Sequence, residues 1–441
     1  MASRPGDDEL PPDPFPGDPF SSDDAIPTPS PEANASPMGG LFAQFAQAAA
    51  SQGTFNADVA RHLAVWTAAG GVVEPNLEPL DRIRVEQVAS TVGPLIEEFT
   101  GLVAHEPGQH LIVTAATKAE WAADALGSWR PLLNGLANGV GSMFDADGPF
   151  GADVDDDSAM PEELRALGLG SLPGGLSGLA KMLGPTLAGM QAGTLLGQLG
   201  AAALGTFDLP IPRTPGSRLL VVASNVASFS NDWTLPADHA LTQIVISDLL
   251  THAILRLSHV GGTLTALIAE HGGAGRIDPS GIGEIGIAGL GGGLGGLLGG
   301  SPGLGGGLGQ PSPDAFLAGE PTPKQVELRR RIQRITIPLV ASIDYVASVI
   351  GARLLGDNRQ VVEALRRRRL DREPGTRLAE HLLGVGIDQV GLDSGRVFVG
   401  GVVQRAGHDG LLALFAEPDR FPTDAELVAP GLWLARIGLT E

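Results

Sequence analysis

The segment that says most about the fold class is residues 236–260, whose sequence is PADHALTQIVISDLLTHAILRLSHV. Aliphatic residues fill most positions, which predicts one long, largely buried helix. At 100° per residue, Asp248, His252 and His259 fall within about 40° of one another. His252 and His259 lie about 10.5 Å apart along the axis, so only Asp248 and His252 could readily share one metal ion. Buried hydrogen bonding is the commoner use of such a pair.

Helical periodicity continues on both sides of this stretch. Asn56 is placed to cap one helix, and residues 80–103 form an amphipathic pattern typical of another. Thr117 with Glu120 and Thr322 with Gln325 are two capping-box starts. The Val-rich residues 397–403 allow a strand or two near the C-terminus. The sequence therefore predicts a mainly α fold.

The most apolar part of the chain runs from residue 173 to residue 205. Gly189, Gly193, Gly197 and Ala201 repeat every four residues and give one smooth helix face. Such a face lets another backbone approach closely, in membranes or in buried cores. Two glutamines and the absence of a basic flank asymmetry favour a core helix over a membrane span of residues 176–205.

Composition excludes several classes of protein. The chain has 441 residues, 50 acidic and 29 basic, and a net charge of −21, which makes nucleic acid a poor partner. With no cysteine there is no disulfide, thiol nucleophile or Cys-containing zinc site. Residues 1–40 lack the apolar run of a signal peptide, so we expect a cytoplasmic protein.

Composition also divides the chain. Residues 1–40 are acidic and proline-rich and predict a disordered tail, and 145–163 form a second acidic segment. A glycine-rich stretch at 273–321 predicts a flexible linker between a helical domain at 41–272 and a mainly helical C-terminal part at 322–441. The C-terminal part is expected to pack on the first domain.

Three other patterns carry little chemistry. Gly281, Gly283 and Gly286 match G-x-G-x-x-G, but they lie in a glycine tract without the preceding strand that a dinucleotide site needs. Residues 105–110, HEPGQH, miss the i, i+4 histidine spacing and contain helix breakers. The arginine runs at 329–331 and 366–369 are interpreted as paired with acids of the same chain or solvated, in preference to a ligand site.

The chain resembles the bacterial zinc-dependent metalloprotease-like proteins, a zincin-like family of candidate hydrolases. The resemblance covers most of residues 41–441. It is carried by Glu120-Trp121, Trp129-Arg130-Pro131, the glycine-faced helix at 185–205, Ser224-Asn225-Val226-Ala227, the helix from Pro236, Arg366 to Arg369, Phe421-Pro422-Thr423 and Leu427. The resemblance implies a zincin-like multi-helix fold.

Active relatives would carry H-E-x-x-H on the 236–260 helix, with two zinc-binding histidines and a glutamate that activates water. This motif is degenerate here. One register places Ser247, Asp248 and Thr251 at the three positions, and the register shifted by one places Asp248, Leu249 and His252 there. Glu270, 18 residues beyond His252, is a candidate third ligand beside Asp248 and His252.

Three functional hypotheses follow. In the leading one the metal site has decayed, no cofactor is bound, and the protein acts as a pseudoenzyme that binds an unknown protein or peptide. The alternative is an active zinc metallohydrolase that uses Asp248, His252 and Glu270 as atypical ligands. A second alternative is a membrane-associated protein anchored by residues 176–205.

Overall fold

A computed structural model describes residues 55–104, 111–142, 175–214, 218–275, 320–371 and 373–439 of the chain. The predicted tail at 1–40, the acidic segment at 145–163 and nearly all of the glycine-rich stretch lie outside the described residues. So do the patterns at 105–110 and 281–286.

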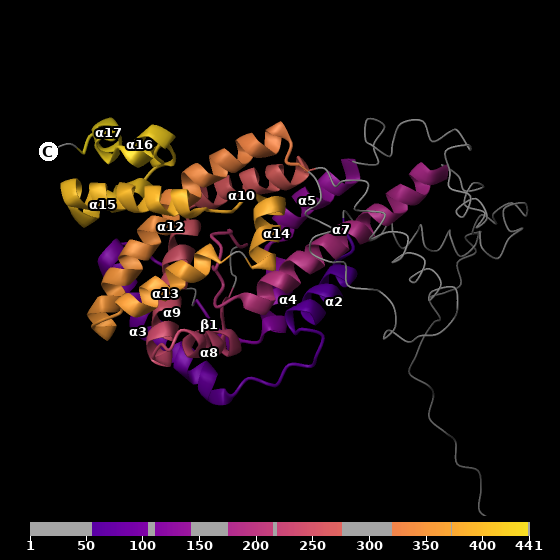
Figure 1. Cartoon of the computed structure of the whole chain (residues 1–441), viewed down its shortest axis with the longest axis horizontal. Coiled ribbons are helices and arrows are strands. Elements are labelled where there is room, and N and C mark those ends of the chain that lie inside the picture. Colours follow the sequence, from indigo (N-terminus) through magenta and orange to yellow (C-terminus); the bar gives the residue numbers. More distant parts are fainter. Residues whose placement is uncertain are drawn as a thin grey trace, which may run out of the picture. The chain divides into compact units, whose positions relative to one another are not determined.

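The described residues are mainly helical, as expected, with two short strands (Figure 1). The first half contains α2 (Ala57–Ala68), α3 (Pro79–Thr100), β1 (Val113–Ala116), α4 (Lys118–Ser128), α5 (Arg130–Ser142), α7 (Gly175–Ala202), β2 (Leu219–Val222), α8 (Ala223–Asp232), α9 (Ala237–Leu255) and α10 (Ser258–Gly273). The second half contains α12 (Pro323–Leu355), α13 (Arg359–Leu370), α14 (Pro374–Leu383), α15 (Gln389–Leu412), α16 (Asp424–Val428) and α17 (Pro430–Arg436).

The predicted helix starts are confirmed, because they depend on contacts within four residues. The Asn56 side chain accepts hydrogen bonds from the first turn of α2. Thr117 and Glu120 form a complete capping box at α4, and Thr322 and Gln325 form another at α12. Each cap satisfies backbone N–H groups that a helix start leaves without partners.

The glycine face of α7 packs directly on α2. A methyl group added at Gly189 would lie 2.6 Å from the Asn56 carbonyl oxygen, and one at Gly193 would lie 2.7 Å from that of Ala60. The predicted close approach of a backbone is therefore confirmed, and its partner is α2 (Figure 1).

The expected strand at 397–403 is wrong, and a pair of strands lies elsewhere. Residues 397–403 belong to α15, which Asp388 caps and which buries Phe398, Val399 and Val402 at helical spacing. The strands β1 and β2 pair in parallel, with Val113 opposite Leu219. About a hundred residues of sequence separate the two partners, so no local pattern in the sequence reveals the pairing.

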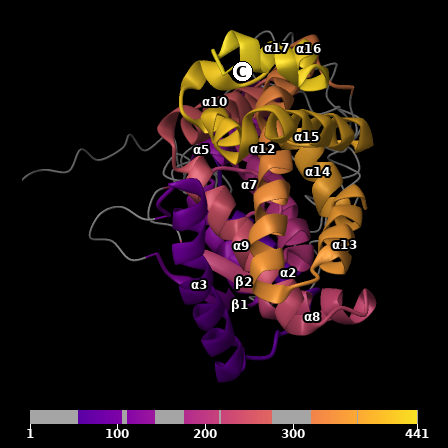
Figure 2. The ribbon, with the colours of Figure 1, turned by 90° about the vertical axis from the view of Figure 1, so that its left-hand side faces the viewer.

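Helix α9 lies at the centre of these elements. It packs against α3 and β2 on the N-terminal side of the chain and against α12 and α13 on the C-terminal side (Figure 2). Helix α10 packs against α5, α12 and α14. Helices from both sides of the glycine-rich stretch thus share one hydrophobic core. The assignment of two domains stays a prediction.

Two parts of the described chain are long and apolar enough to cross a membrane. One is α12, of whose most apolar window 67% is buried. The other is α9 together with α10, which meet at an angle of 90°.

Candidate functional site

The helix predicted at 236–260 is shorter than expected, and the difference separates His259 from the other candidate residues. Helix α9 ends at Leu255, and α10 begins at Ser258 after a bend of 90°. A side chain at Gly261 would overlap the Leu255 carbonyl group, so the glycine permits this close turn. His259 therefore lies on a different helix from Asp248, where its Nε2 is 2.9 Å from the Phe415 carbonyl oxygen.

Asp248 is buried in α9 and holds the loop that follows α7. Its side chain is 4% exposed. One carboxylate oxygen accepts a hydrogen bond from the Thr206 backbone N–H at 2.6 Å, and the other accepts from Phe207 at 3.0 Å. Gly205 presses directly on the same carboxylate, where no Cβ would fit. Both oxygens are therefore occupied by backbone donors, which is the arrangement of a structural carboxylate.

A buried arginine also binds this loop, because its Nη2 donates a hydrogen bond to the Thr206 carbonyl oxygen at 3.2 Å. The Arg213 guanidinium is 5.2 Å from the ring of Trp121 and 5.5 Å from that of Trp129, and it pairs with Asp124 at 3.0 Å. Burial lowers the pKa of Arg213 to about 10, which the charges of Asp124 and Asp248 oppose. Burial also raises the pKa of Asp248 to about 7, against its two backbone hydrogen bonds.

The motif positions on either side of Asp248 carry hydroxyl groups. Ser247 and Thr251 line a cavity beside α9, and the Thr251 hydroxyl donates to the Ser247 carbonyl oxygen at 2.7 Å. In the first register these are the two histidine positions of H-E-x-x-H. A serine and a threonine offer no imidazole nitrogen, so this register provides no zinc ligand pair.

The other predicted ligands are committed to different neighbours. His252 forms a hydrogen bond with the Ala104 backbone, and its ring lies 6.1 Å from that of Phe207. Burial lowers the pKa of His252 to about 4. Glu270 lies on α10, is half-exposed, and pairs with Lys324 at 3.0 Å. The prediction that Asp248, His252 and Glu270 share a metal ion therefore does not fit the donors that the structure brings together.

The rest of the described chain also lacks a set of side chains that could hold a metal ion. Nowhere among its described residues do three His, Asp or Glu side chains lie close enough to hold one metal ion. The residues that the structure describes therefore do not fit the zinc implied by the resemblance.

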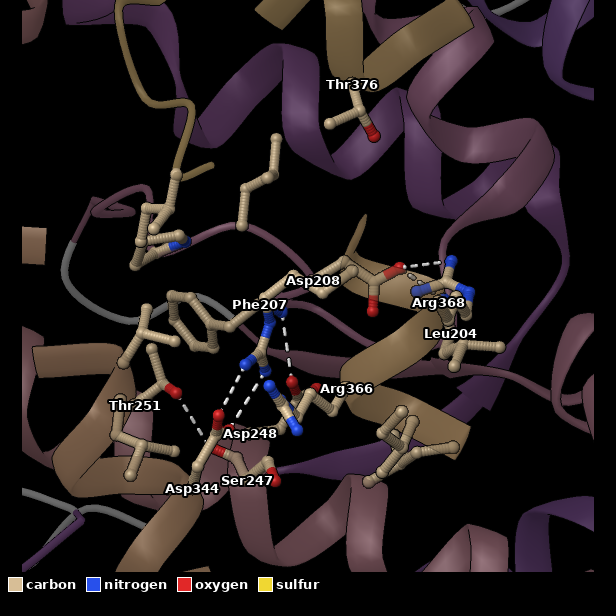
Figure 3. Close-up of a pocket in the computed structure, with 18 of the residues that line it drawn as sticks. Leu204, Phe207, Asp208, Ser247, Asp248, Thr251, Asp344, Arg366, Arg368 and Thr376 are labelled. Carbon is tan, nitrogen blue, oxygen red and sulfur yellow. Dashed lines mark hydrogen bonds and ion pairs between the residues drawn. The ribbon is translucent and has the colours of Figure 1, made fainter. Parts of the chain in front are cut away.

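The cavity beside α9 has a volume of about 460 Å³. Its walls come from the end of α4, the end of α7 and the loop after it, α9, α12, α13, α14 and the first half of α15. Figure 3 shows Ser247, Asp248 and Thr251 from α9 near the Asp208–Arg368 ion pair. A pocket of this size suits a small ligand or a few residues of a peptide.

The second arginine run contributes to this cavity, and its predicted intramolecular pairing is confirmed. Arg367 pairs with Glu363 at 2.8 Å, and Arg366 lies 3.3 Å from Asp393. The run also includes Arg368, which pairs with Asp208 at 2.9 Å, and Arg369, which pairs with Asp344 at 2.6 Å.

Comparison with known proteins supports the resemblance found in the sequence. A model of the zincin-like metallopeptidase family matches residues 55–434. The chain belongs to this family. No curated protein matches the chain. A crystal structure from Chloroflexus aurantiacus, described as a candidate hydrolase with a novel fold, aligns with a TM-score of 0.54 and 17% identity. The alignment covers 88% of this chain and all of the other, and it shows a shared fold.

Two residues that organise this part of the zincin-like protein were not predicted. The Thr206 hydroxyl accepts a hydrogen bond from the Leu220 N–H on β2 at 2.6 Å, and the Arg213 guanidinium contacts the rings of both Trp121 and Trp129. Trp121 and Trp129 are close in sequence, but nothing nearby indicates that an arginine more than 80 residues later contacts both rings. The sequence predicts the helix around Asp248, but it does not predict which residues contact Asp248.

Proposed function

We propose that this member of the zincin-like metallopeptidase family has lost metal-dependent hydrolysis and acts by binding, with the cavity beside α9 as the binding site. The observation that carries the proposal is the state of the motif helix. Both carboxylate oxygens of Asp248 accept hydrogen bonds from backbone N–H groups, and its motif neighbours Ser247 and Thr251 lack an imidazole. Hydrolysis by a zincin needs two histidines and a carboxylate that is free to take a proton.

Elemental analysis of the dialysed, tag-free protein tests this proposal. The expected result is no stoichiometric zinc in the wild type and no cleavage of a peptide mixture. The double variant Ser247→His/Thr251→His is the matched gain-of-binding control, because it places two imidazoles four residues apart on the wall of the cavity. Circular dichroism checks that each variant keeps its helical content.

One result would overturn the proposal. The wild type would bind one zinc ion per chain, and both Asp248→Asn and His252→Ala would lose this zinc while keeping their fold. That result would support the alternative of an active metallohydrolase with atypical ligands, which family membership by itself favours. The cytoplasmic location remains a separate prediction, which cell fractionation tests.

A further inference from the structure

The charged groups that line the cavity are unequal in number. Seven carboxylates and four guanidinium groups lie in its walls: Asp208, Asp248, Asp344, Glu363, Asp371, Glu373 and Glu380 against Arg366, Arg368, Arg369 and Arg396. The arginines are already neutralised in place. Arg368 and Arg369 pair with Asp208 and Asp344, and both Arg366 and Arg396 lie 3.3 Å from Asp393. Glu363 is in turn paired with Arg367 outside these walls, so the negative charge left for a ligand lies on Asp371 and Glu373, which form no ion pair with another described residue.

Glu373 is the clearest example of a carboxylate in these walls without an ion-pair partner among the described residues. It is half-buried at the start of α14 and forms no ion pair with another described residue, because Arg368, the cation that acts on it, pairs with Asp208. Burial raises the pKa of Glu373, and Asp208 and Asp371 raise it further, while Arg368 opposes them. A desolvated carboxylate among like charges favours a cation as its partner.

Two buried donors in the same walls lack acceptors. Trp129 is 2% exposed and lines the cavity, and its Nε1–H has no acceptor among the described residues. Arg366 also lines the cavity, and its Nε–H is buried without an acceptor in the same set. A ligand that fits both donors brings oxygen acceptors, as a peptide backbone does and a simple amine does not.

The remaining walls are apolar. They are formed by the end of α7, the loop after it, α12 and the chain that leads into α15, and they include Leu199, Leu204, Phe207, Leu209, Val385 and Ile387. Apolar walls with a few polar groups are typical of a site that buries side chains of a ligand.

We propose that the cavity binds a peptide segment in which a lysine or arginine is flanked by apolar residues. The basic group lies at Glu373, backbone carbonyl oxygens accept from Trp129 Nε1 and Arg366 Nε, and the flanking side chains fill the apolar walls. This inference rests on the proposed binding function and names the ligand class of that site.

Isothermal titration calorimetry with three capped peptides tests the inference. The probes are acetyl-Phe-Lys-Leu-amide and the same peptide with norleucine or glutamate in place of lysine. Norleucine keeps the aliphatic stem and removes only the charged group. We expect the lysine peptide to bind about tenfold more tightly than the norleucine peptide, which corresponds to one charge-assisted hydrogen bond. The glutamate peptide should bind more weakly than either.

A matched pair of variants assigns this preference to the cavity. Glu373→Gln should bind the lysine and norleucine peptides with equal affinity. Glu86→Gln removes an exposed carboxylate on α3, outside the cavity, and should keep the wild-type preference. Equal or tighter binding of the glutamate peptide by the wild type, a preference that survives in Glu373→Gln, or no binding of any of the three peptides would each overturn the inference.

These results are distinguishable from failure of the proposed function. Zinc-dependent cleavage of the lysine peptide would refute the loss of hydrolysis and leave the preference for a basic residue intact. Absence of zinc together with equal binding of all three peptides would do the reverse.

Discussion

Asp248→Asn tests whether this carboxylate is structural, and the test is its pH dependence. Burial raises the pKa of Asp248 from 3.8 to about 7 in the folded chain. Between these values the folded state holds a proton that the unfolded state has lost, so the contribution of Asp248 to stability is full below pH 3.8 and is lost as pH rises through 7. At 1.36 kcal/mol per pKa unit, the whole change is about 4 kcal/mol.

Part of this change falls in a convenient pH range. Because the sequence pI is about 4.7, measurements begin at about pH 5.5, and the change in stability from there to about pH 8.5 is about 2 kcal/mol. Asparagine does not titrate, so the free energy of unfolding of Asp248→Asn should rise by this amount relative to wild type across the range. The hydrogen-bond acceptor lost in the variant changes stability by the same amount at every pH, and all other groups titrate alike in both proteins. Only the titration of Asp248 therefore changes the difference in the free energy of unfolding with pH.

Urea denaturation of both proteins at several pH values gives the difference directly. A difference that stays flat would show that Asp248 does not titrate in this range, and the structural argument would fail. A difference of opposite sign would mean that the folded state favours the ionised carboxylate, as a bound cation would require.

Four further substitutions test packing and buried polar groups elsewhere in the described part of the chain. Gly193→Ala should destabilise the protein by about 1–3 kcal/mol in urea melts, because the new methyl group would lie 2.7 Å from the Ala60 carbonyl oxygen. Gly93→Ala, at a helix position with open space, is the control and should stabilise by about 0.5–1 kcal/mol. Burial lowers the pKa of His271 to about 4, so its contribution is present above about pH 6.5 and is lost as pH falls toward 4; His271→Gln should flatten the acid side of a thermal-melt series, and an unchanged acid side would refute the assignment. Arg213→Lys keeps the charge but loses the planar guanidinium beside the two indoles and should lower the free energy of unfolding in urea melts by about 1–3 kcal/mol, whereas a wild-type value would show that the guanidinium–indole contacts contribute little.

Local patterns in the sequence were sufficient for several helix starts, but not for the end of α9 at Leu255 or for the helix at 397–403. The cap at Asn56 and the boxes at Thr117 and Thr322 depend on groups within four residues, so the sequence alone predicts where these helices begin. The four-residue glycine repeat in α7 also predicts a close backbone neighbour, because a helix face without side chains has the same shape in any context. Family membership followed from similar patterns spread along the chain.

The identity of each neighbour was decided by the tertiary structure. Asp248 and His252 are four residues apart on one helix, yet one holds the loop at Thr206 and the other the backbone at Ala104. Glu270 faces Lys324, which lies beyond the glycine-rich stretch. Hydrogen-bond partners at such separations depend on how distant helices pack, and a chain-local pattern contains no information about that packing. The sequence by itself therefore determined several helix starts and the family, while the tertiary structure decided which distant groups Asp248, His252 and Glu270 contact.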